Sequence, residues 1–161
     1  SSDLHDIPGL SRSDQRAALV DCLGAAADRL AGTGIRLGVE PLNTHIDHPD
    51  YYLASTSEAL DIVEAVARPE IGITYDLYHS YVMGERIEDV LEGRVHHVVH
   101  AHVADHPGRN DPGTGEIDLG PRLAWLYAQG YAGPVGLEYR PIGATAPALP
   151  LIRARLAGPR R

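Results

Sequence analysis

Cysteine and long apolar runs are nearly absent from this chain, and each shortage argues against a class of protein. Cys22 is the single cysteine, so no internal disulfide can form, and its Ala/Leu-rich surroundings predict a small core residue. No apolar run approaches the ~20 residues needed to span a bilayer. The N-terminal segment SSDLHDIPG lacks the basic flank and apolar centre of a signal peptide. We therefore expect a cytoplasmic protein in a reducing compartment, without membrane association.

Clustered positive charge is also scarce. The formal net charge is -8, and basic residues form no run before the final pair, Arg160 and Arg161. A nucleic-acid partner requires a basic patch, so the composition argues against one and favours a small polar ligand. With 161 residues, 43% of them hydrophobic, the chain is expected to form one domain, residues 1–161. Such a domain buries about 70% of its unfolded surface.

Apolar segments of two different periods alternate along the chain. Short runs rich in β-branched residues predict strands at about 35–39, 71–75, 95–103 and 135–137. Helical periodicity predicts helices at about 11–31, 55–67, 84–92, 118–130 and 145–156, with Ser11 or Ser13, Ser55 and Asp118 as N-caps. Strands that alternate with helices are typical of βαβ units, so we expect an α/β fold with a parallel sheet whose two faces are covered by helices or packed.

The predicted strand at 95–103 differs from the others because histidines are threaded through it. A strand buried on both faces is nearly all apolar, so some of these imidazoles are expected to face a polar site. Alternation places His100 and His102 on the same face. His102 is nearest the end of the strand and is therefore the first candidate ligand. The Gly/Pro-containing loop at 106–116 is expected to be ordered and functional.

Each predicted strand ends in a residue suited to bind a cation, and these residues are Glu40, Asp76, His102 and Glu138. They are separated by 36, 26 and 36 positions. The mean of about 33 matches a β/α barrel, in which about 250 residues form eight units. The C-terminal ends of barrel strands meet at one mouth, so three carboxylates and one imidazole are expected to converge there. Such a set favours Mg²⁺, Mn²⁺ or Co²⁺ over a metal that prefers thiolates.

Five segments of the chain carry a resemblance to a known family. They are EPLNTHIDHPDYYL at 40–53, DLYH at 76–79, HAHVADHPGR at 100–109, GTGEI at 113–117 and GLEYRP at 136–141. In this order they resemble the hydroxypyruvate isomerase family of the xylose-isomerase-like barrel superfamily, which also includes ketose 3-epimerases and inosose dehydratases. The resemblance implies a TIM-type β/α barrel. This chain matches only its last four βα units, strands five to eight.

The resemblance also implies roles for individual residues. The divalent metal ion is expected to be bound by the four strand-end residues, Glu40, Asp76, His102 and Glu138. Glu40 and Glu138 are expected to form the catalytic acid/base pair as well. His79 and Arg109 are expected to bind substrate oxygens, and Glu116 to order the long loop. One departure concerns His102, because hydroxypyruvate isomerases usually carry Gln there, whereas the epimerases carry His.

The chemistry that the resemblance implies suits these residue types. Moving a proton between adjacent carbons of a small hydroxycarbonyl compound passes through an enediolate, whose negative charge a divalent cation stabilises. Two carboxylates then flank the carbon skeleton to remove and return the proton. Arg109 can hold a substrate carboxylate in a bidentate grip, which favours hydroxypyruvate over a neutral sugar. The expected reaction interconverts hydroxypyruvate and 2-hydroxy-3-oxopropanoate.

Three alternatives to this reaction stay open. The chain can belong to a ketose 3-epimerase or related sugar isomerase, or it can be a noncatalytic metal-binding remnant of the barrel. An abasic-site endonuclease is disfavoured by the acidic net charge and by too few ligands for a three-metal cluster. Each residue also has a structural explanation. A carboxylate after a strand is often a helix cap, and Arg109 can pair with Asp105 or Asp111 of its own loop.

Four strands cannot close a β/α barrel. A monomer of this chain would expose two unpaired sheet edges and the apolar inner faces of its strands. We therefore expect either a homo-oligomer that rebuilds an eight-stranded ring or a longer polypeptide that supplies an N-terminal half-barrel. The start at Ser1, without an initiating Met, favours the longer polypeptide.

Overall fold

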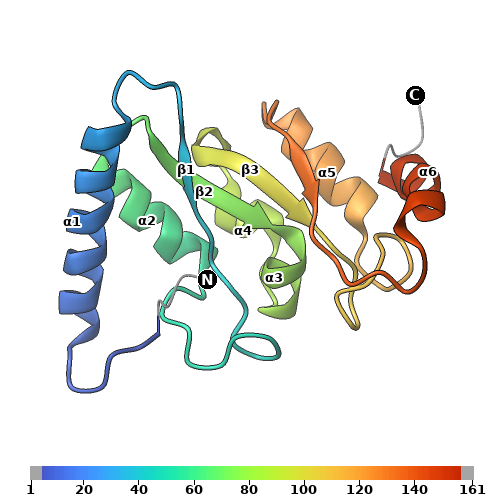
Figure 1. Cartoon of the computed structure of the whole chain (residues 1–161), viewed down its shortest axis with the longest axis horizontal. Helices are drawn as coiled ribbons and strands as arrows, with labels where there is room; N and C mark the ends of the chain where they lie inside the picture. Colours follow the sequence, from blue (N-terminus) through green and yellow to red (C-terminus); the bar gives the residue numbers. More distant parts are fainter. Residues whose placement is uncertain (1–4, 157–161) are drawn as a thin grey trace.

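A parallel sheet forms the centre of the protein. The computed structural model describes residues 5–156, within which the strands are β1 (Leu37–Val39), β2 (Ile71–Asp76), β3 (Val98–Val103) and β4 (Val135–Leu137). Neighbouring strands are parallel, in the order β1-β2-β3-β4 (Figure 1). Because this order follows the sequence, each strand is joined to the next by a helical crossover, as in a β/α barrel. The predicted α/β fold with a parallel sheet is confirmed.

Helices occupy the connections between the strands. In the described part of the chain they are α1 (Arg12–Leu30), α2 (Thr56–Val66), α3 (Leu77–Val82), α4 (Ile87–Leu91), α5 (Leu119–Ala128), α6 (Thr145–Leu156) and the short 3-10 helix η1 (Val95–His97). The side-chain oxygens of Ser11 and Ser55 accept bonds from the backbone N–H groups of Asp14 and Glu58. Both serines are therefore the N-caps that the sequence predicts.

The helices cover one face of the sheet and form the hydrophobic core with it (Figure 1). Tyr75, Ala101 and Val103 are fully buried at alternate positions of β2 and β3. On the opposite face, His100 and His102 of β3 are only partly buried, whereas β2 is buried at every position. Within residues 5–156, the expectation that both faces are covered by helices or packed therefore holds for β2 but not for β3. The reason is that four strands form half of the ring that an eight-stranded barrel needs.

Several element boundaries differ from those predicted. β3 begins at Val98, because the preceding three residues form η1 instead of extending the strand. Arg94, next to η1, binds Glu64 and Asp61 of α2 at 2.7 Å each, which holds this turn against the helix. Helix α3 was not predicted at all. It begins directly after β2, in a stretch for which no element was predicted, and the expected helix at 84–92 is reduced to α4.

Two predictions about individual side chains, the burial of Cys22 and the capping bond of Asp118, differ from the structure. Cys22 is exposed, because the buried face of α1 is formed by Leu23 and Ala27. Asp118 precedes α5 as predicted, but its side chain makes no capping hydrogen bond. The cysteine prediction failed because α1 lies at the side of the molecule and packs along one stripe only (Figure 1).

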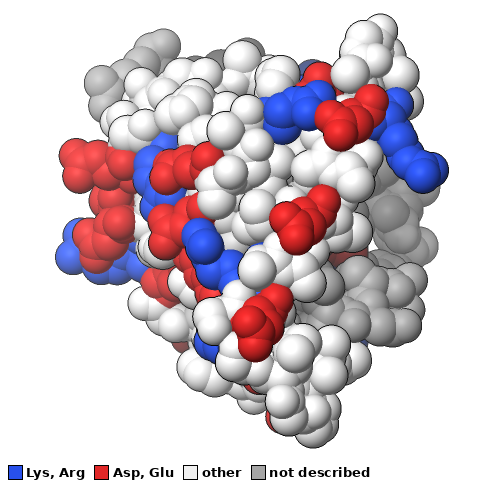
Figure 2. All heavy atoms as spheres, turned by 90° about the vertical axis from the view of Figure 1, so that its left-hand side faces the viewer, with Lys and Arg blue, Asp and Glu red and all other residues white. Residues whose placement is uncertain are grey.

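Ion pairs connect the outer helices. Arg12 of α1 binds Glu58 of α2 at 2.5 Å, and Asp28 of α1 binds Arg68, just beyond α2, at 2.5 Å. Figure 2 shows acidic and basic side chains interspersed on the face that includes α1. Between residues 5 and 156, no helix combines the length and the apolarity that crossing a membrane requires.

Candidate active site

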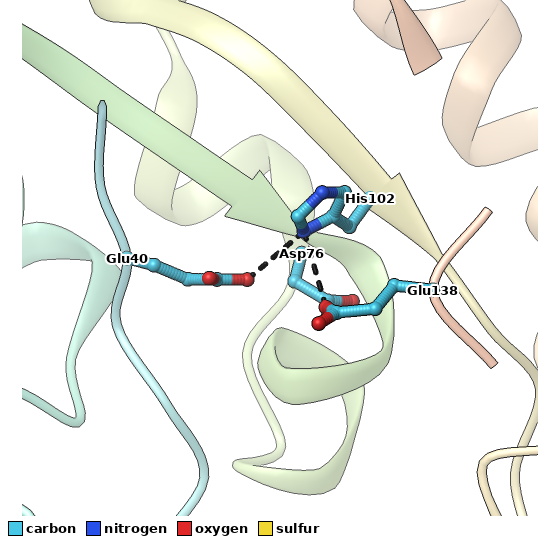
Figure 3. A group of neighbouring side chains, drawn as sticks. All are labelled: Glu40, Asp76, His102 and Glu138. Carbon is cyan, nitrogen blue, oxygen red and sulfur yellow. Dashed lines mark hydrogen bonds and ion pairs between the residues drawn. The ribbon is translucent and has the colours of Figure 1, made fainter. Parts of the chain in front are cut away.

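The four predicted ligands lie together at the C-terminal ends of the strands. Glu40 and Glu138 directly follow β1 and β4, whereas Asp76 and His102 lie at the ends of β2 and β3. Each one stands two positions after a residue on the inner face of the sheet, and these inner residues are Gly38, Thr74, His100 and Gly136. The alternation of the strands therefore directs all four ligands toward the same side. Figure 3 shows their side chains converging from the four strand ends.

The geometry of the cluster suits a single cation. One ligand atom from each of the four residues lies within 4.8 Å of all the others. His102 Nδ1 is 3.1 Å from Glu40 Oε1 and 3.2 Å from Glu138 Oε2, so the imidazole stands between the two glutamates (Figure 3). Three carboxylates and one imidazole are donors that fit a divalent ion such as Mg²⁺ or Mn²⁺. The donor set and its spacing thus fit the group that the sequence implied.

Gly136 provides the space in which the two inner histidines fit. It lies opposite His102 in the register of β3 and β4. A Cβ atom at this position would be 2.7 Å from His100 Nε2 and 2.8 Å from His102 Cδ2, closer than real Cβ atoms approach such neighbours. The two imidazoles contact each other edge to face, with ring centroids 4.6 Å apart. The lack of a side chain at Gly136 therefore leaves the space that the ring of His102 occupies.

The excess of carboxylates changes the protonation of His102. Hydrogen bonds to Glu138 and Glu40 raise the pKa of His102 to about 10, although burial acts in the opposite direction. The bond to His102 in turn lowers the pKa of Glu138, assisted by the charge of Arg109. In the metal-free protein at neutral pH, the imidazole therefore carries the positive charge that balances the glutamates.

Asp76 acts both as a helix cap and as a member of the site. Its Oδ1 atom accepts the backbone N–H of Tyr78 at 2.8 Å and so begins α3. Its Oδ2 atom lies 3.3 Å from Arg109 Nη2. Burial raises the pKa of Asp76 to about 6, while the charge of Arg109 opposes this increase. The structural and functional explanations of this carboxylate are therefore compatible.

Arg109 points out of its own loop and into the cluster. Its Nη2 atom donates to Glu138 Oε2 at 2.8 Å and to Asp76, not to the loop carboxylates. Its backbone has a φ of 55°, which is uncommon for a residue other than glycine. The N–H of Arg140 holds the Arg109 carbonyl at 2.6 Å. The loop thus maintains a strained backbone at the residue whose side chain reaches the site.

Asp105 organises the long loop, a role that the family resemblance implies for Glu116. Asp105 is completely buried, and its carboxylate accepts backbone N–H groups from His106, Gly113 and Ile117 at 2.8–3.0 Å. The side chain of Glu116 is 60% exposed and lies 3.7 Å from His106 Nε2. A buried acid surrounded by N–H groups fixes a loop more firmly than an exposed one. Asp105 therefore makes the stronger contacts in the loop, and the role of Glu116 stays a prediction.

His79 reaches the site from α3 and is almost completely buried, with 1% of its surface exposed. Its Nε2 atom lies 3.6 Å from Asp76 Oδ2. On its other side, Nδ1 contacts Asn43, which was not predicted to take part in the site. Burial, together with the charge of Arg109, lowers the pKa of His79 to about 3, so the imidazole is neutral near pH 7. The structure thus brings all six predicted site residues together.

Comparison with known proteins identifies close relatives of this chain. It is 35% identical over 133 residues to the hydroxypyruvate isomerase of Escherichia coli. The matched region covers 83% of this chain and 51% of that protein. It is 33% identical over 141 residues to the 2-oxo-tetronate isomerase of Pectobacterium atrosepticum. Here the matched region covers 86% of this chain and 52% of that protein. Among solved structures, a family 2 AP endonuclease from Brucella melitensis matches with a TM-score of 0.84 and 33% identity, covering 91% of this chain and 57% of that one.

The chain spans about half the length of the curated relatives that it matches. This fraction agrees with the four strands found between residues 5 and 156, where a complete barrel has eight. Residues 4–155 match the family described as Xylose isomerase-like TIM barrel. Sequence, fold and relatives agree, and the chain belongs to the xylose isomerase-like TIM barrel family.

Proposed function

We propose that this chain carries the metal-binding and proton-transfer half of an isomerase that acts on a small hydroxycarbonyl compound. The reaction that fits best interconverts hydroxypyruvate and 2-hydroxy-3-oxopropanoate. The observation that carries this proposal is the position of Glu40 and Glu138, which approach His102 from opposite edges of the sheet (Figure 3). Two carboxylates in this arrangement can act on adjacent carbons of one substrate. The names of the relatives from Escherichia coli and Pectobacterium atrosepticum agree with this reaction class.

The proposed ligands of the divalent metal ion are Glu40, Asp76, His102 and Glu138. When bound, Mg²⁺, Mn²⁺ or Co²⁺ supplies positive charge that stabilises an enediolate. His102 must lose its proton before Nδ1 can act as a ligand, because only the neutral imidazole has a free electron pair there. Asp76 is already held in place by the N-terminus of α3 and by Arg109, so the ligand set is largely pre-formed.

The proposed proton-transfer residues are Glu40 and Glu138. In the forward direction, one glutamate removes a proton from C3 of hydroxypyruvate, and the electron pair of that C–H bond moves into an enediolate between C2 and C3. The other returns a proton to C2, while the hydroxyl proton on O3 passes to O2, so that C3 becomes the aldehyde carbon and the substrate neither gains nor loses protons overall. Glu40 follows β1 and Glu138 follows β4, so they lie at opposite edges of the sheet. This separation keeps both carboxylates available to the same carbon skeleton.

His79 and Arg109 are proposed to bind the substrate. The Arg109 guanidinium is 14% exposed and is held by Asp76 and Glu138, so it is oriented before a ligand arrives. A planar guanidinium binds a carboxylate in bidentate geometry. This feature favours an α-keto acid substrate over the neutral sugar of a ketose 3-epimerase, which is the second candidate reaction.

The acid/base roles are tested by exchange with solvent deuterium. With Mn²⁺ and hydroxypyruvate in D₂O, the protein is expected to place deuterium on the substrate carbon, as followed by ¹H NMR. Glu40→Gln and Glu138→Gln should each reduce the exchange rate by about 10² or more, because an amide cannot act as a base. Glu116→Gln is the matched control, because Glu116 is an exposed acid of the neighbouring loop.

Three outcomes of the exchange experiment are informative. Undiminished exchange in both glutamine variants would exclude the acid/base assignment. Exchange with D-fructose but not with hydroxypyruvate would replace the proposed reaction by that of a 3-epimerase. Metal binding without exchange on either substrate would leave a noncatalytic binding domain.

A further inference from the structure

Two nitrogen atoms of Asn43 contact the same ring nitrogen of His79. The backbone N–H of Asn43 donates to His79 Nδ1 at 3.2 Å, and Asn43 Nδ2 lies 2.6 Å from the same nitrogen. Both residues are almost completely buried, so water does not compete for these bonds. A backbone N–H can only donate, so Nδ1 accepts this bond, and the side-chain contact is compatible with that only if the nitrogen of the Asn43 amide faces the ring.

The contacts of Asn43 fix the orientation of its amide. Its Oδ1 atom accepts the backbone N–H groups of Ile46 at 3.1 Å and Asp47 at 3.0 Å. Its Nδ2 atom donates one hydrogen to Asp47 Oδ2 at 2.8 Å, an oxygen that Tyr78 also binds at 2.8 Å. If the amide were flipped, Nδ2 would face two N–H donors and Oδ1 would face a carboxylate. The atom next to His79 is therefore the nitrogen, and its second hydrogen points to Nδ1.

This arrangement leaves one protonation state for His79. Nδ1 faces two donors, the backbone N–H and the side-chain amide of Asn43, so it must be the acceptor. The tautomer with a proton on Nδ1 and the doubly protonated imidazolium would both direct N–H toward N–H. The neutral tautomer with its proton on Nε2 is the one that satisfies all contacts.

The proton on Nε2 has no acceptor in the described part of the chain. Within residues 5–156, Nε2 is buried and has no hydrogen-bond partner, and Asp76 Oδ2 at 3.6 Å is too distant for a good hydrogen bond. Leaving a buried N–H unpaired is unfavourable, because the group has lost its bond to water without a replacement. Such a donor beside the metal-ligand cluster is suited to an oxygen that arrives with the substrate.

We propose that Asn43 is a positioning residue that locks His79 as a neutral Nε2–H donor to a substrate oxygen. A neutral donor stabilises negative charge that develops on a carbonyl oxygen and still keeps its proton. His79 then cannot act as a competing base, which leaves proton transfer to Glu40 and Glu138. The identity of the substrate oxygen rests on the proposed function, whereas the tautomer of His79 does not.

The tautomer can be measured without metal or substrate. In protein labelled with ¹⁵N-histidine, long-range ¹H–¹⁵N correlation spectra distinguish a protonated from an unprotonated ring nitrogen, and His79→Gln identifies the His79 signals. The expected wild-type spectrum at pH 7.5 has an unprotonated Nδ1 and a protonated Nε2. A protonated Nδ1 in the wild-type protein would overturn the proposal, whatever the enzyme activity.

The role of Asn43 is tested by substitutions at that position. Asn43→Asp replaces the donor by a carboxylate, which should draw the proton to Nδ1 and shift this nitrogen to its protonated position. Asn43→Ser removes the amide donor but keeps the backbone N–H that donates to Nδ1, so it should raise the population with a protonated Nδ1 less than Asn43→Asp does. The control is Asn110→Asp, because the Asn110 side chain bonds only the carbonyl of Pro107 among the described residues.

The outcomes separate this inference from the proposed isomerase activity. Unchanged His79 signals in both folded Asn43 variants would exclude a positioning role for Asn43. If isomerase activity is present, Asn43→Asp should lower kcat more than it changes KM, because the donor acts on charge that develops in the transition state. A confirmed tautomer without isomerase activity would contradict the proposed function alone.

Discussion

At the scale of single residues, the charge of the site is balanced by protons and arginine in the absence of a metal ion. His102 has a pKa of about 10 because it is bonded to Glu138 and Glu40, so it is protonated at neutral pH. Arg109 adds a second positive group against Asp76 and Glu138. A divalent cation that enters this cluster has to displace the proton of His102 and weaken the ion pairs of Arg109 with Asp76 and Glu138.

Metal binding is therefore expected to release about one proton per site at pH 7.5. Because the folded-state pKa of His102 lies above this pH, the affinity for Mn²⁺ should increase as the pH rises toward 10 and decrease as it falls. Isothermal titration calorimetry in buffers of different ionisation enthalpy measures the number of protons released. His102→Gln should bind Mn²⁺ more weakly and without that release. Identical heats in all buffers for the wild-type protein would contradict the protonation state described here.

Asp105 offers a second prediction at this scale. Asp105→Asn is expected to destabilise the protein by about 1–3 kcal/mol, because an amide nitrogen then faces backbone donors in a buried site. The free energy of unfolding can be measured with urea. Asp118→Asn is the control, since Asp118 is exposed and makes no capping bond. Equal stability of the two variants would show that Asp105 does not fix the loop.

At the scale of elements, β4 contributes to the site through Gly136, which has no side chain to displace the two inner histidines. Gly136→Ala is expected to push His102 out of place, because the new Cβ would overlap with both inner imidazoles. The affinity for Mn²⁺ should fall at least tenfold, with a smaller effect on folding. Gly143→Ala is the control, because a Cβ there meets no atom within 4 Å. Equal Mn²⁺ affinity in the two variants would exclude this role of Gly136.

The sequence predicts the strands and the strand-end residues well because both follow a local period. Alternation along β3 is enough to place His102, and the same rule applies to the other strand ends. Helix α3 was missed because its first turn is started by Asp76, a residue interpreted only as a ligand. Asn43 and Asp105 were missed because their roles depend on contacts with backbone groups that no pattern displays. The signal in each case was a short polar side chain within four positions after the end of a strand, a place suited to bind local N–H groups.

At the scale of the whole molecule, the sheet described between residues 5 and 156 has two unpaired edges, β1 and β4. Apolar side chains are exposed near both, with Ile35 58% and Leu137 39% exposed. Open edges of this kind pair with other strands. The isolated chain of 161 residues is therefore expected to form dimers or larger assemblies, as measured by size-exclusion chromatography with light scattering. A soluble, well-ordered monomer would contradict this expectation.

The central claim is that one divalent cation binds where the four strand ends meet. Anomalous diffraction from a crystal soaked in Mn²⁺ tests it most directly. We predict one peak at about 2.0–2.4 Å from His102 Nδ1 and from carboxylate oxygens of Glu40, Asp76 and Glu138. A map with no peak among these residues, or with its strongest peak elsewhere on the chain, would contradict the claim.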